Sequence, residues 1–98
     1  MITKRPSPKA DHVLVTFQLP ATIWAETVHL VGDFNDWSRH AHPLKRTESG
    51  NWEIVIELPA HRAYHFRYLV DGTSWQNDWN ADRYVPNPFG GDNSVIDL

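Results

Sequence analysis

The amino-acid sequence predicts an all-β protein, a β-sandwich of about seven short strands. Segments in which apolar and polar residues alternate recur along the chain, as is typical of strands with one buried face. Turn-forming residues, mainly Pro, Gly, Asn and Asp, separate these segments. The best helical candidate, residues 21–27, is too short to be stable alone. The 98 residues suffice for one domain with a single core.

The expected strands begin and end at turn-forming residues. Residues 12–19 alternate strictly and are followed by a proline, and residues 52–58 are the most regular segment of the chain. The Asp71–Gly72 dipeptide predicts a tight turn after residues 63–70, because glycine adopts positive φ at no steric cost. In chain order, we expect strands at residues 12–19, 27–32, 44–47, 52–58, 63–70, 73–76 and 93–98.

Two further segments complete the predicted organisation. Residues 1–10 hold two prolines among charged residues and are expected to form a flexible N-terminal segment. Residues 77–92 contain two prolines and two glycines, which predicts a long ordered loop. The folded domain is therefore expected over residues 11–98.

Charge and composition argue against several classes of function. The net charge is −3 and basic residues form no stripe, so nucleic acid is not an expected partner. No apolar run reaches the roughly 20 residues that span a bilayer, so no membrane contact is expected. The chain has no cysteine and shows no pattern of a secretory signal. We therefore expect a cytoplasmic location.

The sequence also offers no clear catalytic or metal-binding motif. His40 and His42 flank one alanine, but two histidines without a third ligand are a weak metal signal. Paired aspartates occur in two loops, at Asp33 with Asp36 and at Asp78 with Asp82, where turn formation is the default explanation. We expect no metal, no cofactor and no catalytic residue, and hence no enzyme activity.

Five tryptophans in a chain of this size indicate either an aromatic core or a surface role for some of the rings. Trp52 alternates in phase with apolar neighbours and is expected in the core, and Trp24 is expected to pack near a turn. Trp37 lies outside any alternation, which favours a functional surface ring over one that caps the end of the sandwich. Trp75 follows a turn and lies between two polar residues, which also favours a functional ring. Trp79 is open to two interpretations: it extends the same site, or it pins the long loop.

Several motifs, in order, resemble one known family. The runs VHLVGDFNDWS, GNWEIVIELP, YHFRYLVDG and NPFGGDNSVIDL resemble carbohydrate-binding module family 48, over about residues 12 to 98. This family includes the N-terminal domains of isoamylases, pullulanases and glycogen branching enzymes. It is similar to the glycogen-binding domain of the AMP-activated protein kinase β subunit. The resemblance implies an early-set immunoglobulin-like β-sandwich.

The resemblance also implies a carbohydrate-binding site. Its residues are Trp37, Arg67, Trp75, Phe89 and Asn93. Flat aromatic rings can cover the C–H face of a pyranose, while Arg67 and Asn93 can hydrogen-bond to its hydroxyls. Structural alternatives remain open for three of them: Arg67 as a solvated strand residue, Phe89 as a ring closing a loop over the core, and Asn93 as the start of the last strand.

We therefore expect non-catalytic binding of an α-1,4-linked glucan, such as glycogen, starch or a maltooligosaccharide, through exposed tryptophans. The first alternative is a protein–protein docking module for a glycogen-metabolising enzyme of the amylase family, or for a kinase. A hydrolase is a weaker alternative, because a sandwich of this size rarely offers a deep cleft. The sequence leaves open whether the domain acts alone or within a larger enzyme.

Overall fold

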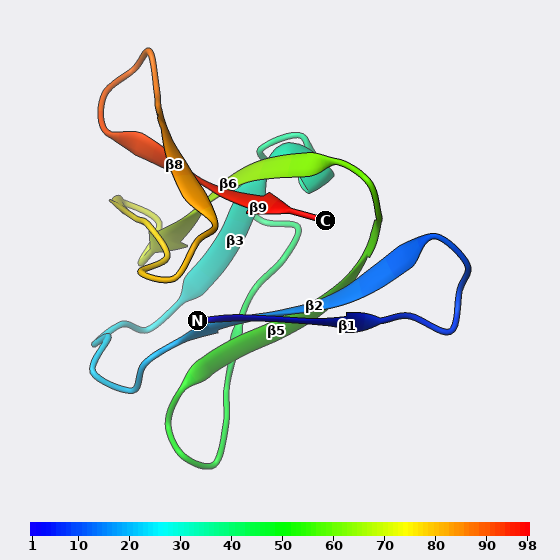
Figure 1. Ribbon diagram of the computed structural model, residues 1–98. Helices are drawn as coiled ribbons and strands as arrows, with labels where there is room; N and C mark the ends of the chain where they lie inside the picture. The colour runs from blue at the N-terminus through cyan, green and yellow to red at the C-terminus, as the bar shows by residue number, and fades with distance from the viewer.

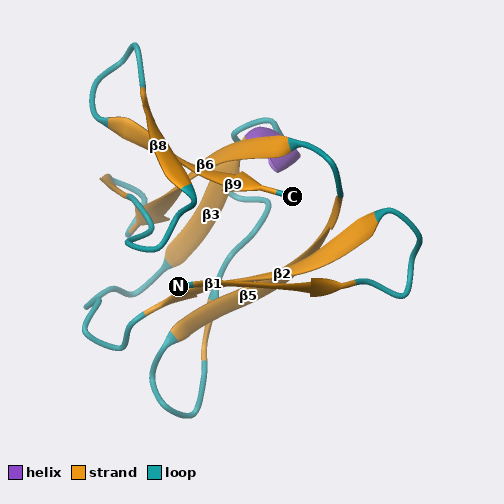
Figure 2. Ribbon diagram, viewed as in Figure 1, coloured by secondary structure: helices purple, strands orange, loops and turns teal.

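The computed structural model describes residues 1–98 and forms a sandwich of two antiparallel sheets. One sheet has the strand order β1-β2-β5-β4, and the other has the order β3-β6-β9-β8 with β7 also paired to β6. In Figure 1 the first sheet lies in the lower half of the view and the second in the upper half. Besides strands, Figure 2 shows only a single helical turn, η1. The elements are β1 (Ile2–Pro6), β2 (His12–Leu19), β3 (Val28–Gly32), η1 (Asp33–Asn35), β4 (Lys45–Arg46), β5 (Trp52–Pro59), β6 (Ala63–Val70), β7 (Ser74–Gln76), β8 (Arg83–Pro86) and β9 (Asp92–Asp97).

The core forms where the alternating faces of the two sheets meet. Phe17 of β2 and Phe66 of β6 are fully buried, and their rings pack edge to face with centroids 5.1 Å apart. Trp52 is 5% exposed, which confirms its predicted place in the core. The main buried cluster consists of Val15, Phe17, Leu19, Val28, Leu30, Leu44, Trp52, Leu58, Tyr64, Phe66, Tyr68, Val70 and Ile96.

The predicted all-β sandwich is confirmed, and most strands lie close to their expected positions. β2 and β6 have the predicted bounds, and the expected strands at 27–32, 44–47, 52–58, 73–76 and 93–98 differ by one or two residues at their ends. The predicted turn after β6 is also present, with φ of 52° at Asp71 and 70° at Gly72.

Residues 1–10 differ from the flexible segment that we expected. Ile2–Pro6 form β1, which pairs with the edge of β2 that β5 leaves free. Ile2 packs against the core, and Lys4 hydrogen-bonds to Asp82 and to the Asp97 carbonyl, at 2.5 and 3.1 Å. The strand pairing and these contacts across the sandwich order a segment that has little apolar character of its own.

Two other expectations were wrong. The loop expected over residues 77–92 contains β8, an edge strand that pairs with β9 and ends at Pro86, where the missing N–H removes no central ladder bond. Trp24 is 91% exposed instead of packed, because its neighbour Ile23 takes the position against the core.

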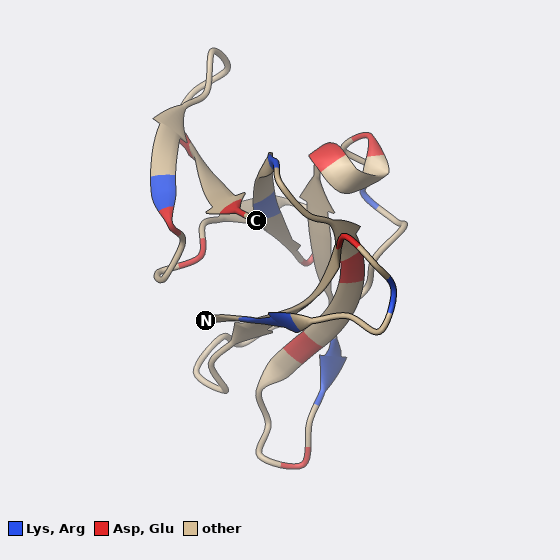
Figure 3. Ribbon diagram, turned by 45° about the vertical axis from the view of Figure 1, so that its right-hand side comes forward, with Lys and Arg blue, Asp and Glu red and all other residues tan.

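Charged residues of both signs are spread over both sheets and several loops (Figure 3). The chain contains no helix whose length and apolar character would let it cross a membrane. The cytoplasmic location stays a prediction.

Candidate functional site

A groove opens on the second sheet where one edge of β6 changes partner. The first half of β6 pairs with β9 as far as Phe66, opposite Ser94, and its second half pairs with β7 from Tyr68, opposite Gln76. Arg67 lies between these two pairings. The side chains of β7 and of the loop before β9 therefore lie on either side of Arg67.

The loop that carries Trp37 lies close to β6 because of Gly32. A Cβ atom at Gly32 would lie 2.5 Å from the His65 carbonyl oxygen, so only glycine fits there. Asn35 then fixes the turn that follows: its Oδ1 accepts the N–H groups of Gly32 and Ser38 at 3.1 and 3.2 Å. Its Nδ2 donates to the Leu30 carbonyl at 2.9 Å.

The indole of Trp37 is oriented by Asp33. Trp37 Nε1 donates to Asp33 Oδ1 at 3.0 Å, and Asp33 Oδ2 accepts the His65 N–H at 2.8 Å. Because β3 ends opposite Phe66, this N–H has no partner from β3. The carboxylate of Asp33 thus connects the Trp37 ring to the edge of β6, and the ring stays half-buried.

Trp75 lies on β7, opposite Leu69 of β6, and is also half-buried. Two guanidinium groups approach its ring: the Cζ atoms of Arg67 and Arg39 lie 5.5 and 5.6 Å from the ring centroid. Arg67 Nε is buried and has no hydrogen-bond partner. This arrangement disfavours the interpretation of Arg67 as a freely solvated strand residue.

Besides the Trp37 loop and β7, the loop between β8 and β9 lines the groove. Asn87 Nδ2 donates to Asn93 Oδ1 at 3.0 Å, and Asn87 Oδ1 accepts the Phe89 N–H at 2.8 Å. Phe89 is 97% exposed, so it does not close the loop over the core. At Gly91, with φ of 69°, a Cβ atom would lie 3.1 Å from Arg67 Nη2, so the backbone of this loop lies directly beside the guanidinium.

All five residues predicted from the resemblance line this one groove, which has a volume of about 540 Å³. Sequence reasoning missed five other lining residues: Asp33, Arg39, His65, Asn87 and Pro88. Asp33 belongs to the same turn-forming segment as Trp37, so the range of that segment was an available signal for this residue. Trp79 lies outside the groove and lines a separate hollow with Met1 and Pro20.

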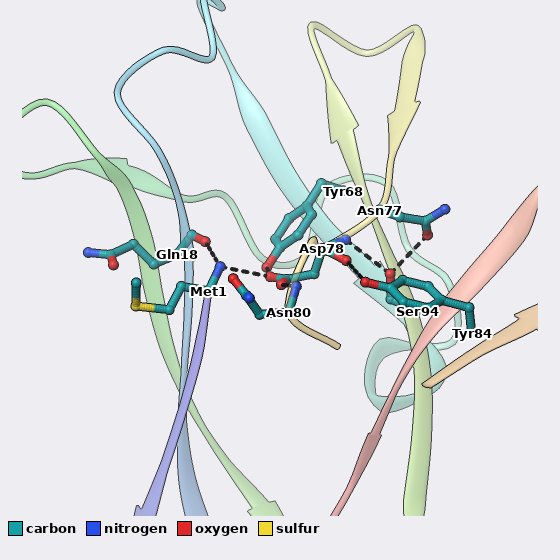
Figure 4. Close-up of polar contacts among 8 residues, drawn as sticks. All are labelled: Met1, Gln18, Tyr68, Asn77, Asp78, Asn80, Tyr84 and Ser94. Atoms are coloured by element: carbon teal, nitrogen blue, oxygen red, sulfur yellow. Dashed lines mark hydrogen bonds and ion pairs between the residues drawn. The ribbon is translucent and has the colours of Figure 1, made fainter. Parts of the chain in front are cut away.

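A second polar cluster lies on the other side of β6, around Asp78, whose side chain is fully buried (Figure 4). Asp78 Oδ2 accepts the Tyr68 hydroxyl at 2.7 Å and the terminal ammonium of Met1 at 3.2 Å. Asp78 N–H donates to Ser94 Oγ at 3.0 Å. Burial raises the pKa of Tyr68 well above its usual value, and the neighbouring carboxylate raises this pKa further. The Tyr68 hydroxyl therefore stays a donor, and the cluster anchors the segment after β7.

Indole rings, amides and guanidinium groups around one groove of a β-sandwich are the features of a carbohydrate-binding module. The chain belongs to carbohydrate-binding module family 48, described as the isoamylase N-terminal domain, whose profile matches residues 7–90.

Similar curated proteins are named 1,4-alpha-glucan branching enzymes. The chain is 46% identical over 52 residues to the enzyme of Novosphingobium aromaticivorans, 36% over 67 residues to that of Butyrivibrio fibrisolvens, and 44% over 72 residues to that of Thiobacillus denitrificans. These matches cover 48%, 64% and 68% of the chain, respectively. They span only 7% of the first enzyme and 10% of each of the other two.

Proposed function

We propose that the protein binds an α-1,4-linked glucan in the groove and does not catalyse a reaction. The observation that carries this proposal is the convergence of Trp37, from the loop after η1, and Trp75, from β7, on one groove with Phe89. The names of the similar enzymes support an α-glucan as the ligand.

Each lining residue has a role that suits a neutral, hydroxyl-covered chain. The two indoles and Phe89 cover the C–H faces of successive pyranose rings and exclude water from them. Asn93 Oδ1 accepts a hydrogen bond from Asn87, whereas Asn93 Nδ2 lies at the longer distance of 3.5 Å from His65 Nδ1. Nδ2 is therefore the atom of Asn93 that is better placed to donate to a sugar hydroxyl. Arg67 supplies a rigid fork of further donors.

The number of carboxylates in the groove argues against hydrolysis. Asp33 is the only carboxylate that lines it, and both of its oxygens already accept hydrogen bonds. Glycosidases use a pair of carboxyl groups on either side of the scissile bond. The groove therefore supports binding without bond cleavage.

A titration with maltoheptaose or β-cyclodextrin, followed by calorimetry and tryptophan fluorescence, tests the proposal. We expect saturable binding, with Trp37→Ala and Trp75→Ala each weakening the affinity at least about tenfold, because each removes a stacking surface. Trp24→Ala is the matched control, since this indole is exposed and lies outside the groove. No binding at millimolar sugar, or an equal loss in the control, would contradict the proposal.

A second candidate function is docking to a glycogen-metabolising enzyme. Trp24 and Trp79 are 91% and 72% exposed and do not line the groove, and exposed indoles are enriched at protein interfaces. Purified 1,4-alpha-glucan branching enzyme is the partner to test by sedimentation. Loss of the complex in Trp79→Ala, but not in Trp75→Ala, would favour this function.

A further inference from the structure

The two arginines of the groove have no acceptor within the protein. Neither Arg39 nor Arg67 donates a side-chain hydrogen bond or forms an ion pair, although both guanidinium groups lie within 5.6 Å of the centroid of the same Trp75 ring. Arg83, by contrast, donates to both oxygens of Asp97, at 3.1 and 3.0 Å. Both arginines line the same groove, so their unpaired N–H donors lie within one small part of the surface.

The groove also carries a local surplus of positive charge in a chain whose net charge is −3. Asp33 is the only carboxylate of the lining, and it is engaged by the indole N–H of Trp37 and by a backbone N–H. Two like charges near one ring repel each other, and this repulsion is strongest where water is partly excluded. An anion between the guanidinium groups would relieve it.

We infer that the groove prefers glucan chains that carry a phosphate monoester over the same chains without it. The inference rests on the proposed function: the sugar ring lies on the indoles, and the phosphate lies between Arg39 and Arg67. A phosphate offers three acceptor oxygens and about −1.5 to −2 charges at neutral pH, and it matches the planar fork of arginine. A sugar hydroxyl could accept some of these hydrogen bonds but would leave the charges uncompensated.

The two arginines differ in how firmly they are held. The Arg67 guanidinium lies beside the backbone at Gly91, and its Nε is buried, so the position of its fork is fixed by the fold. Arg39 is exposed and belongs to the loop after η1. Arg67 therefore provides the fixed half of the phosphate site, and Arg39 provides the half that adapts to the position of the phosphate along the chain.

The test compares a phosphorylated maltooligosaccharide with the same sample after phosphatase treatment. By calorimetry at low ionic strength, we expect the phosphorylated chain to bind about tenfold more tightly. Raising the ionic strength from about 0.02 to about 0.5 M should shrink this ratio, because salt screens exposed charges. Arg39→Gln should bring the ratio close to one. Arg5→Gln removes a positive charge from β1, outside the groove, and should leave the ratio unchanged.

Each outcome bears on the inference. Equal affinities for the two samples would overturn the phosphate preference while leaving glucan binding in place. A preference that survives both Arg39→Gln and Arg67→Gln would also overturn it, since the phosphate would then be held elsewhere. Binding of neither sample would overturn the inference and the proposed function together. Competition by inorganic phosphate against the phosphorylated chain alone would support the inference.

Discussion

The buried cluster around Asp78 and the groove around Trp75 are both rich in polar groups, but they differ in how completely these groups are partnered. Asp78 is fully buried, and both of its oxygens, its N–H and its carbonyl all take part in hydrogen bonds. In the groove, Arg39 and Arg67 lie near an aromatic ring and have no acceptor. The two regions lie on opposite sides of the same strand, β6.

This difference separates stability from binding. Buried polar groups are tolerated when each has a partner, and removing one partner leaves the others unsatisfied. Unpartnered donors on a partly exposed surface add little to folding, but they can pair with a ligand. We therefore expect substitutions in the Asp78 cluster to lower the free energy of unfolding, and substitutions in the groove to lower affinity.

The largest expected effect is that of Asp78→Ala. It leaves the Tyr68 hydroxyl without its acceptor and removes the carboxylate beside the terminal ammonium, which keeps only the Gln18 carbonyl. We expect the free energy of unfolding in urea to fall by about 3 kcal/mol. Asp92→Ala, an exposed aspartate with no side-chain hydrogen bond, is the control and should change it by less than about 0.5 kcal/mol. Equal stability of the two variants would show that partnering in this cluster contributes little.

The next largest effect is expected in the groove, at Asp33, whose carboxylate orients the Trp37 ring. In Asp33→Asn, one of the two acceptor oxygens becomes an NH₂ donor, which then faces either the Trp37 indole N–H or the His65 N–H. We expect the loss of orientation at Trp37 to weaken maltoheptaose binding about fivefold, with a change in unfolding free energy below about 1 kcal/mol.

Asp36→Asn is the matched control for this variant, because Asp36 is an exposed neighbour in the same loop and asparagine tolerates its φ of 54°. This control should bind maltoheptaose like the unchanged protein. If Asp33→Asn proves mainly destabilising, with unchanged affinity in the folded protein, Asp33 is part of the fold and does not position the ring.

The strands that the sequence predicted well are those whose pattern is local. Alternation located β2 and β6 to the residue, because each has one face on the core and an identifiable turn at its end. β1 and β8 were missed because they are edge strands, with prolines at or beside their ends and no apolar alternation. Their pairing depends on distant residues of β2 and β9, which no local pattern reveals.

The lining of the groove shows the same limit. Trp37 could be singled out because it lies outside any alternation, and Trp75 because it follows a turn; the resemblance then indicated three further residues. Arg39 and Asn87 could not be found, because their positions depend on consecutive left-handed residues before Arg39 and on the fold of the β8–β9 loop. Motifs thus predicted the centre of the candidate site, and loop conformation decided its rim.

The smallest expected effect concerns a pair of intermediate burial, Lys4 and Asp82, whose side chains are 33% and 35% exposed. Burial alone would raise the pKa of Asp82, but hydrogen bonds from Lys4 and from the Asp97 N–H hold this pKa below its usual value. The pair therefore stabilises the fold above the unfolded pKa of about 3.9, and this contribution is lost as the pH falls through the lower folded pKa.

Lys4→Gln should lower the free energy of unfolding in urea by at most about 1 kcal/mol at pH 7, and by progressively less toward pH 3. A loss of unfolding free energy as large as that of Asp78→Ala would mean that a polar group's contribution to stability depends on its hydrogen-bond partners alone. A small, acid-sensitive loss would mean that the contribution depends on burial as well.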